Sequence, residues 1–566
     1  MLYKKLVGFY EEASSTTKRL EKIKILAKFL GRIPEPEKEV LYLILGNIYP
    51  EHDERKMGIS NQLAIKAISK STGAEEKEVV NEWKLTGDLG KVAEKLKSKK
   101  AQSTLYKSIL TVEKVLDNLR KLPELEGKGA VGKKISLITE LLSHASDKEA
   151  LYLTRTIIGD LRIGLKESTI KESIALAFFS DEKKEASKRI QDAINKSNDI
   201  GLVFETAKSR KINNLDKISL EIGKPIKVML SQKAKTISDG FKALGKPCAI
   251  EYKYDGFRLV IHKKSETGEI TLFTRNLENV TKQFPEVVEY VRKYVKGKSF
   301  ILDAEAVGFN KNTHEYLPFQ NISKRIKRKY DIEKLREELP IEVNVFDIIY
   351  YNGKLLLNES FRKRTELIKK IVKSEKFKIS CAKQIITSSE KEAEKFYKTA
   401  LKDNQEGVMM KSLESIYQPG SRVGFMLKVK PEDRDYDLVI TGAEYGTGKR
   451  SGWLSSFILS CRDKNNFLEV GKVGTGIKEK EEQGVSFEEL TKKLTPLVTK
   501  EKGKTVQITP KIVVSITYQE IQKSPNYNSG FALRFPRFIA IREDKPLSDI
   551  ATLQEIKKDH EKQKRT

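Results

Sequence analysis

The chain has 566 residues, 39% of them hydrophobic and 33% charged, and it is too long for one hydrophobic core, so three domains of ordinary size are expected. Lys and Arg outnumber Asp and Glu by 107 to 79, a formal charge of +28. This surplus predicts attraction to a polyanion such as nucleic acid, the alternative being the lysine-rich surface of a thermophilic protein. With no run of eighteen apolar residues and no signal-peptide start, the sequence predicts neither membrane insertion nor export, and a cytoplasmic location is expected.

Residues 1 to 222 are predicted to be helical, because apolar residues recur there at helical spacing. Two such stripes are Leu20, Ile23, Leu26 and Leu30, and Leu105, Ile109, Val112, Leu116 and Leu119. Gly223 and Pro225 then favour a first domain boundary. The predicted first domain is therefore 1–222.

From about residue 231 the apolar period changes to two, with short strands, glycine-containing turns and a helix predicted over 388–402, which is an α+β pattern. A second boundary is expected at Pro431. Beyond it, strands punctuated by glycine and a helix over 548–563 favour a small β-barrel. The predicted domains are thus 1–222, 223–431 and 432–566.

The cysteines and histidines exclude other kinds of site. Cys248, Cys381 and Cys461 are far apart and lack the CxxC spacing of a zinc site, and they suggest no disulfide framework. The five histidines are scattered singly, with no nucleophile–base pattern. A hydrolase-type triad is therefore not expected.

The segment IEYKYDGFRL, 250–259, predicts a reactive lysine. Strand alternation places Glu251 and Lys253 on one face before Asp255-Gly256 turns the chain. A lysine attacks phosphorus only when neutral, so nearby cations that lower its pKa are needed, and Lys428 and Lys430 share one face of a later strand. The alternative is an ordinary hairpin with an exposed lysine.

Two further strands carry polar groups suited to a nucleotide. Asp303 and Glu305 project together from ILDAEAV, and two carboxylates on one strand face suit Mg²⁺ or ribose hydroxyls. Phe346 shares the polar face of the strand 343–351, whereas Val343, Val345 and Ile349 are expected on the other. An aromatic ring there suits a purine, although it could instead lie beneath a helix.

Seven stretches occur in a fixed order: EYKYDGFR (251–258), TRNLENVT (274–281), ILDAEAV (301–307), VNVFDIIYYNG (343–353), EGVMMK (406–411), LKVK (427–430) and LRFPRFIAIREDK (533–545). They resemble the motifs of the covalent nucleotidyltransferases. Nearly the whole chain, including GDLRIGL at 159–165, resembles the ATP-dependent DNA ligases of the archaeal and eukaryotic type. Ala304 stands where that family often has glycine, a small departure.

The resemblance implies a fold and a reaction. The fold would be an all-α N-terminal DNA-binding domain, an α+β adenylation domain and a C-terminal OB-fold. Lys253 would attack the α-phosphate of ATP, the AMP would pass to a 5′-phosphate at a nick, and the 3′-hydroxyl would displace it. The expected partner is nicked double-stranded DNA, in replication, repair and recombination, with Mg²⁺ or another divalent cation as cofactor.

The resemblance also assigns residues. Nucleotide-binding positions would be Glu251, Arg258, Arg275, Glu305, Phe346, Arg422, Lys428, Lys430, Arg534 and Arg537, and metal ligands Glu305 and Glu406. The C-terminal motif, which also holds Arg542, would orient the leaving pyrophosphate. Simple alternation places Lys411 on the opposite face from Glu406, so Glu406 is favoured over Lys411.

Two rival functions remain open. One is another covalent nucleotidyltransferase, an RNA ligase or a GTP-using capping enzyme, though neither commonly carries a helical region of this length before KxDG. The other is a non-catalytic DNA-binding scaffold, which leaves the motif set unexplained. Whether ADP or GTP replaces ATP is not decided by the sequence.

Three segments have competing interpretations. Gln102, Leu105 and Tyr106 follow the spacing of a short sliding-clamp-binding box, but Leu105 and Tyr106 also fit a helical core stripe. GAEYGTGKRS, 442–451, ends like a phosphate-binding loop, yet Ala443 and Arg450 break that motif, so a basic hairpin is predicted. KRIKRK, 324–329, could be a solvated basic face or a phosphate-contacting helix. A monomer is expected.

Overall fold

A computed structural model of the chain describes residues 1–33, 38–99, 109–326, 328, 330–431, 434–479 and 484–563. Internal contacts divide the chain into two compact units. One comprises Met1–Tyr49, Arg55–Ala177 and Glu432–Arg565, and the other comprises Pro50–Glu54 and Phe178–Pro431. Among the described helices, none has the length and apolar character needed to cross a membrane.

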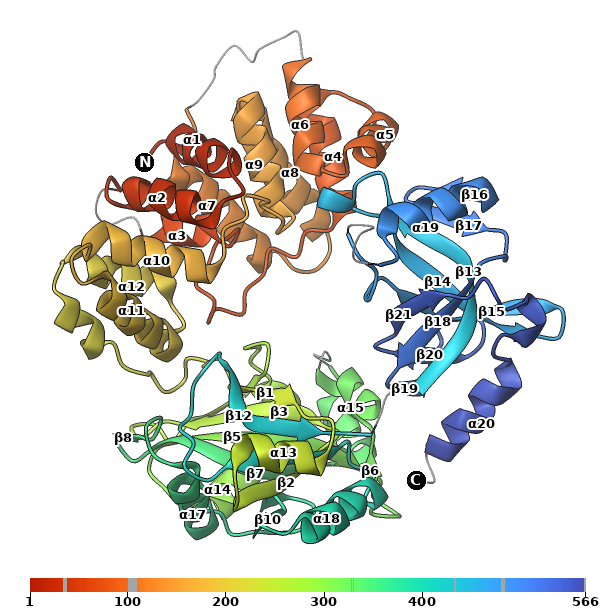
Figure 1. The fold of residues 1–566 in the computed structure, drawn as a ribbon. Coiled ribbons are helices and arrows are strands. Elements are labelled where there is room, and N and C mark those ends of the chain that lie inside the picture. Colours follow the sequence, from red (N-terminus) through yellow and green to blue (C-terminus); the bar gives the residue numbers. More distant parts are fainter. Residues whose placement is uncertain are drawn as a thin grey trace. The chain divides into compact units, whose positions relative to one another are not determined.

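The N-terminal part of the chain is helical (Figure 1, red to yellow). Its helices are α1 Tyr3–Ser14, α2 Arg19–Leu30, α3 Glu39–Ile44, α4 Asn61–Thr72, α5 Glu76–Thr86, α6 Leu89–Ser98, α7 Val112–Lys121, α8 Ala130–His144, α9 Asp147–Ile157, α10 Glu167–Phe178, α11 Lys183–Ser197 and α12 Ile200–Lys208. Short 3₁₀ turns follow α7 and α12.

The two predicted apolar stripes are only partly buried. Ile23, Leu26 and Leu30 lie in the core, but Leu20, in the first turn of α2, is 71% exposed. Ile109 is 75% exposed because α7 begins only after the N-cap residue Thr111. Leu105 and the proposed clamp-binding box around it lie outside the described residues.

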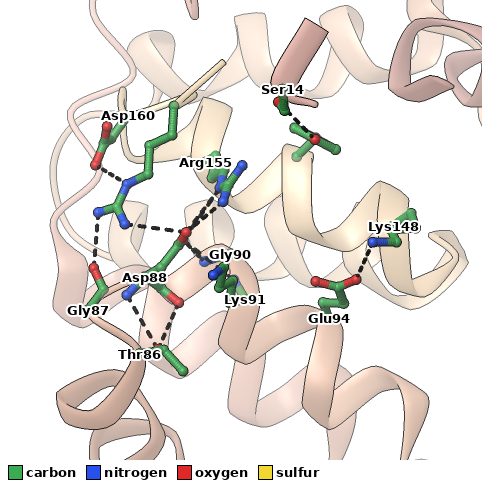
Figure 2. Close-up of polar contacts among 12 residues, drawn as sticks. Ser14, Thr86, Gly87, Asp88, Gly90, Lys91, Glu94, Lys148, Arg155 and Asp160 are labelled. Atoms are coloured by element: carbon green, nitrogen blue, oxygen red, sulfur yellow. Dashed lines mark hydrogen bonds and ion pairs between the residues drawn. The ribbon is translucent and has the colours of Figure 1, made fainter. Parts of the chain in front are cut away.

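A buried carboxylate joins α6 to α9 (Figure 2). Asp88, 2% exposed, caps α6 by accepting the backbone N–H of Gly90 at 2.9 Å. Its Oδ2 also accepts a hydrogen bond from the guanidinium of Arg155 on α9 at 2.7 Å. Burial alone would raise the pKa of Asp88, but the hydrogen bond and charge of Arg155 outweigh it and the pKa is lowered.

The segment GDLRIGL attaches to the same cluster. Arg162 has a φ of 58° and places its guanidinium 3.3 Å from the Asp88 carboxylate, while also donating to the carbonyl of Gly87 at 3.0 Å. The buried ammonium of Lys22 donates to the carbonyl of Ile163. These contacts fix a loop whose backbone would otherwise be held by few bonds of its own.

The central part of the chain contains two facing sheets with helices (Figure 1, yellow to cyan). The strands are β1 Leu230–Lys233, β2 Cys248–Lys253, β3 Phe257–Lys263, β4 Ile270–Thr274, β5 Phe300–Phe309, β6 Tyr316–Leu317, β7 Ile341–Tyr351, β8 Lys354–Leu355, β9 Ile379–Cys381, β10 Gln384–Thr387, β11 Gly407–Ser412 and β12 Arg422–Val429. The helices are α13 Ile237–Leu244, α14 Pro285–Tyr294, α15 Phe319–Ile326, α16 Ile332–Glu338, α17 Phe361–Ile371 and α18 Glu390–Lys402.

The two sheets share one interior. The first has the order β1-β12-β11-β2-β10, and the second runs β4-β3-β5-β7-β8. Helices α13 and α18 cover the outer face of the first sheet, and α14 and α17 cover the outer face of the second. A third apolar cluster, with Val260 and Ile301 from one sheet and Val423 and Met426 from the other, joins the inner faces. Inner-face side chains from both sheets therefore point toward each other.

The C-terminal part is strand-rich (Figure 1, blue). It contains β13 Arg434–Tyr445, β14 Leu454–Asp463, β15 Asn466–Val473, β16 Val498–Lys502, β17 Thr505–Ile508, β18 Val513–Tyr518, β19 Glu520–Lys523, β20 Phe531–Arg534 and β21 Arg537–Ile541, with α19 Phe487–Leu494 and α20 Leu553–Gln563. The long strand β13 pairs with β14 along much of its length, with β18 at its start and with β17 at its end, which bends the sheet.

The fold class predicted from the sequence is confirmed: a helical N-terminal region, an α+β central region and a β-rich C-terminal region. The 442–451 segment joins β13 to β14, as the hairpin interpretation predicted. The two interpretations of KRIKRK are wrong for Arg325, which is fully buried and pairs with Glu286 at 2.6 Å. Burial of α15 against the second sheet explains this, since one face of the helix must enter the core.

Candidate active site

Strand β2 presents its polar residues to the space between the sheets. Ile250 and Tyr252 lie in the apolar cluster under α13 and α18, so Glu251 and Lys253 occupy the other face, as alternation predicts. Lys253 ends the strand and pairs in register with Gly407 of β11. The lysine is thus held by a central strand, with its side chain 21% exposed.

Glu406 brings two lysines together. Its Oε2 lies 2.6 Å from Nζ of Lys253 and 3.1 Å from Nζ of Lys430. Burial alone would raise the pKa of Glu406, but the charges of the two lysines outweigh it and the pKa is lowered. The pKa of Lys428 is lowered by burial and then by the charges of Lys430 and Lys253. The cations expected beside Lys253 are therefore present.

Lys411 also belongs to this group, so the prediction that placed it on the opposite face from Glu406 is wrong. Its Nζ lies 2.6 Å from Oε2 of Glu251 and 4.8 Å from the ring centre of Phe346. Alternation fails because β11 begins only at Gly407, whose φ is 140°, so Glu406 lies outside the strand. Burial raises the pKa of Glu251, and the charge of Lys411 opposes that rise.

On the facing sheet, Arg258 and Asp303 form a buried pair. Nε of Arg258 donates to Oδ1 of Asp303 at 2.7 Å, and the hydroxyl of Tyr417 donates to Oδ2 at 2.7 Å. Burial would lower the pKa of Arg258, but Asp303 raises it overall. Asp303 is fully buried, and Arg258 and Tyr417 already occupy its carboxylate oxygens. These contacts do not support the expectation that Asp303 joins Glu305 in binding Mg²⁺ or ribose.

Phe346 occupies a bulge. Opposite β5, the register of β7 skips a residue twice, at Phe346 and at Ile349. The Phe346 ring is half-buried, with the Arg258 guanidinium 5.2 Å from its centre. As a result of the second skip, Ile349 lies in the apolar cluster between the sheets, whereas Ile348 packs with Val345 in the core beneath α14 and α17. The prediction that Ile349 shares a face with Val345 is therefore wrong.

The remaining predicted arginines lie at exposed positions or in the other unit. Arg275 is exposed in the turn after β4, and Arg422 is exposed at the start of β12, where it donates to the carbonyl of Ser231 at 2.7 Å. In the C-terminal region, Arg534 pairs with Glu520 at 2.9 Å, Arg542 lies 3.2 Å from Asp437, and Arg537 is exposed on β21.

Comparison with known proteins places this site in a family. A model of the ATP dependent DNA ligase domain matches residues 228–430, a DNA ligase N terminus model matches 2–175, and an ATP dependent DNA ligase C terminal region model matches 450–545. The chain belongs to the ATP-dependent DNA ligases. Enzymes of this family seal nicks in DNA with ATP as co-substrate and a divalent metal, releasing AMP and pyrophosphate, and this ligase does so too.

Similar ligases are archaeal. The DNA ligase of Nanoarchaeum equitans is 43% identical over 568 residues, covering 100% of this chain and 99% of its own. That of Thermococcus fumicolans is 39% identical, covering 98% of each. The solved protein Pmar-Lig_PreS3 is 18% identical with a TM-score of 0.57, covering 95% of this chain and 99% of its own, a likeness of fold.

Two carboxylates of the ligase fit a divalent metal. Burial, with Glu406 and Asp303 nearby, raises the pKa of Glu305 to about 8 against the opposing charges of Lys253 and Arg258. Glu305 and Glu406 are both partly exposed, so a cation from solution can reach these two like charges. In the described part of the chain no group of three or more His, Cys, Asp or Glu side chains could hold a metal. Glu305 and Glu406 instead suit Mg²⁺, which keeps most of its waters and takes one or two carboxylates beside phosphates.

Sequence reasoning missed several residues that complete the site. Tyr417 comes from the loop between β11 and β12 and contacts Asp303, and Gln384 comes from the edge strand β10 and contacts Glu251. Their partners are distant in sequence, so no spacing signals them. Only SIYQPGSR around Tyr417, with Arg422 in the same segment, could have drawn attention to that loop.

Proposed function

We propose that Lys253 is the nucleophile of this ligase and carries AMP between ATP and DNA. The observation that supports this most is the ion-paired group of Lys253, Glu406 and Lys430 between the two sheets. Nζ of Lys253 would form a bond to the α-phosphorus of ATP as the bond to pyrophosphate breaks. A 5′-phosphate oxygen at a nick then takes the AMP, and the 3′-hydroxyl displaces it.

Neighbouring charges would prepare Lys253 for attack. Lys430 shares the Glu406 carboxylate with Lys253, and the charges of both lysines act on Lys428. Glu406 would hold Nζ in place through the 2.6 Å contact until the nucleotide enters. Glu305 and Glu406 would hold a divalent metal, which would supply positive charge against the phosphate oxygens.

The nucleotide would lie between the sheets. Phe346 would stack on the adenine ring, and the buried carboxylate of Glu251 would accept a hydrogen bond from its amino group. Ribose and phosphate contacts are proposed for Arg258, Arg275, Glu305, Arg422, Lys428 and Lys430, and pyrophosphate contacts for Arg534, Arg537 and Arg542. Exposed positions, as for Arg275 and Arg422, are compatible with ligand contact.

The rest of the chain would serve the DNA. We propose domains over 1–222, 223–431 and 432–566, with the helical domain gripping duplex DNA through its phosphates. The three matched regions, 2–175, 228–430 and 450–545, support this division. We also propose that the ligase is a monomer in the cytoplasm, associated with the nucleoid. Gln102, Leu105 and Tyr106 would bind a sliding clamp.

The lysine assignment has a direct test. Incubation with α-radiolabelled ATP and Mg²⁺ is expected to label the wild-type protein, whereas Lys253→Ala and Lys253→Arg stay unlabelled, since guanidinium remains protonated. Lys354→Ala, which removes an exposed lysine paired with Glu359, is the matched control and keeps the label.

The same variants separate chemistry from folding. Lys253→Ala is expected to seal a nick that is already adenylylated, because that step needs no attack by Nζ. AMP found on the Lys253→Ala protein by mass spectrometry would overturn the assignment.

A further inference from the structure

The edge strand β10 supplies a side chain to the proposed base-binding group. Gln384 pairs in register with Glu251 of β2, and its Nε2 donates to Oε1 of Glu251 at 2.9 Å. Nε2 also lies 3.2 Å from Oγ1 of Thr365 on α17. The other carboxylate oxygen of Glu251 lies 2.6 Å from Nζ of Lys411. Each oxygen of this buried carboxylate is thus held by one donor.

The orientation of the Gln384 amide is fixed at both ends. Nζ of Lys369 donates to its Oε1 at 3.1 Å, so that atom is the acceptor and Nε2 must face Glu251. A flipped amide would bring its oxygen against the carboxylate and its NH₂ against an ammonium. The three contacts therefore make Gln384 a donor toward Glu251.

We propose that Gln384 is a positioning residue that sets the preference of this ligase for ATP over GTP by holding the Glu251 carboxylate as an acceptor. The proposal rests on the function proposed above for Glu251 and Phe346. At carbon 6, adenine carries an amino donor, whereas guanine carries a carbonyl acceptor. An ionised carboxylate only accepts, so it pairs with the first and repels the second.

The experiment compares nucleotide preference in four variants. Single-turnover protein labelling is measured over a range of α-radiolabelled ATP and GTP concentrations. For Gln384→Leu, the ratio of ATP to GTP efficiency is expected to fall about tenfold, mainly through a higher half-saturating ATP concentration, because one hydrogen bond to a charged group is lost.

Gln384→Glu is expected to reduce the ratio further. Two adjacent carboxyls share a proton, and the protonated one can donate to the guanine carbonyl. GTP labelling should therefore rise in absolute terms, a gain that damage to the fold would not produce.

One further test variant and one control keep the test decisive. Lys369→Ala changes an exposed residue, so the fold is kept, and the freed amide is expected to lower the ratio about twofold to threefold. Ile386→Ala, on the same strand with its side chain 44% exposed, should leave the ratio unchanged. Melting temperatures of all variants are measured beside the labelling.

Three results would overturn the inference. An unchanged ratio in Gln384→Leu and Gln384→Glu, with both nucleotides slowed equally, would mean that Gln384 is structural only. Equal use of ATP and GTP by the wild type would remove the preference that Gln384 is said to set. Absence of any ATP label on wild-type Lys253 would reject the proposed function itself, and the inference with it.

Discussion

The buried carboxylate of the helical region and the carboxylate of the active site are both paired with cations, but they differ in how completely. Asp88 receives donors on both oxygens, from Gly90 and Arg155, with Arg162 beside them, and its side chain is 2% exposed. Lys253 and Lys430 both contact Oε2 of Glu406, whose side chain is 14% exposed. The contacts of Asp88 thus engage both of its oxygens, whereas the two lysine contacts of Glu406 meet at Oε2. Asp88 is therefore engaged within the helical region alone, whereas Glu406 joins the two lysines of the candidate site.

The largest effect on protein labelling is expected at Glu406, and it would sharpen this contrast. Glu406→Gln should slow protein labelling by ATP about 100-fold at saturating Mg²⁺, because a charged group near the reacting phosphate is lost. The melting temperature should stay within about 2 °C, since the residue is not part of the core. Glu414→Gln, an exposed glutamate paired with Arg362, is the control. A labelling rate within twofold of the wild type would reject a role for Glu406.

Asp88 should respond in the opposite way. Asp88→Ala leaves the Arg155 charge buried and unpaired, so the free energy of unfolding should fall by about 3–5 kcal/mol. Labelling of the folded protein by ATP should be unchanged, because Lys253 lies in the other compact unit. Denaturant unfolding measures the free energy of unfolding, and incorporation of radiolabel measures the reaction with ATP. The control is Asp160→Ala, which removes an exposed partner of Arg162. A loss under about 1 kcal/mol would break the comparison.

A smaller effect on stability is expected from His262, a buried side chain that belongs neither to the Asp88 cluster nor to the candidate active site. Burial lowers the pKa of His262 to about 3, the charge of Lys264 adding to it, and the Gly223 N–H donates to its Nδ1 at 3.0 Å. Because the folded pKa lies below the unfolded value, the unfolded chain takes up the proton and stability is lost as pH falls below about 6.5.

The measurement is the free energy of unfolding at two pH values. Between about pH 7.5 and about pH 5, His262 should contribute a loss of about 2 kcal/mol. That loss should be missing in His262→Gln, which can still accept from Gly223. Equal losses in the two proteins would mean that His262 is protonated in the folded state.

Local patterns predicted the parts of the site that lie on regular strands. Alternation placed Glu251 and Lys253 correctly because β2 is an interior strand with a regular register to both neighbours. It failed at Lys411, because β11 starts at Gly407, and at Ile349, because β7 skips residues opposite β5. The contacts of Tyr417 with Asp303 and of Gln384 with Glu251 could not be predicted, since each joins segments more than a hundred residues apart. A single sequence carries no local signal for such pairings.

Gly407 sets a limit for anyone redesigning this enzyme. With a φ of 140°, a Cβ built there would lie 2.2 Å from the carbonyl oxygen of Val429 and 3.2 Å from Cα of Lys430. Any side chain would force apart the two strand ends that carry Glu406 and Lys430. A mutant library for altered nucleotide use should therefore keep this codon constant. The library should instead vary Gln384, Lys369 and Lys411, where the contacts are made by side chains and not by the backbone.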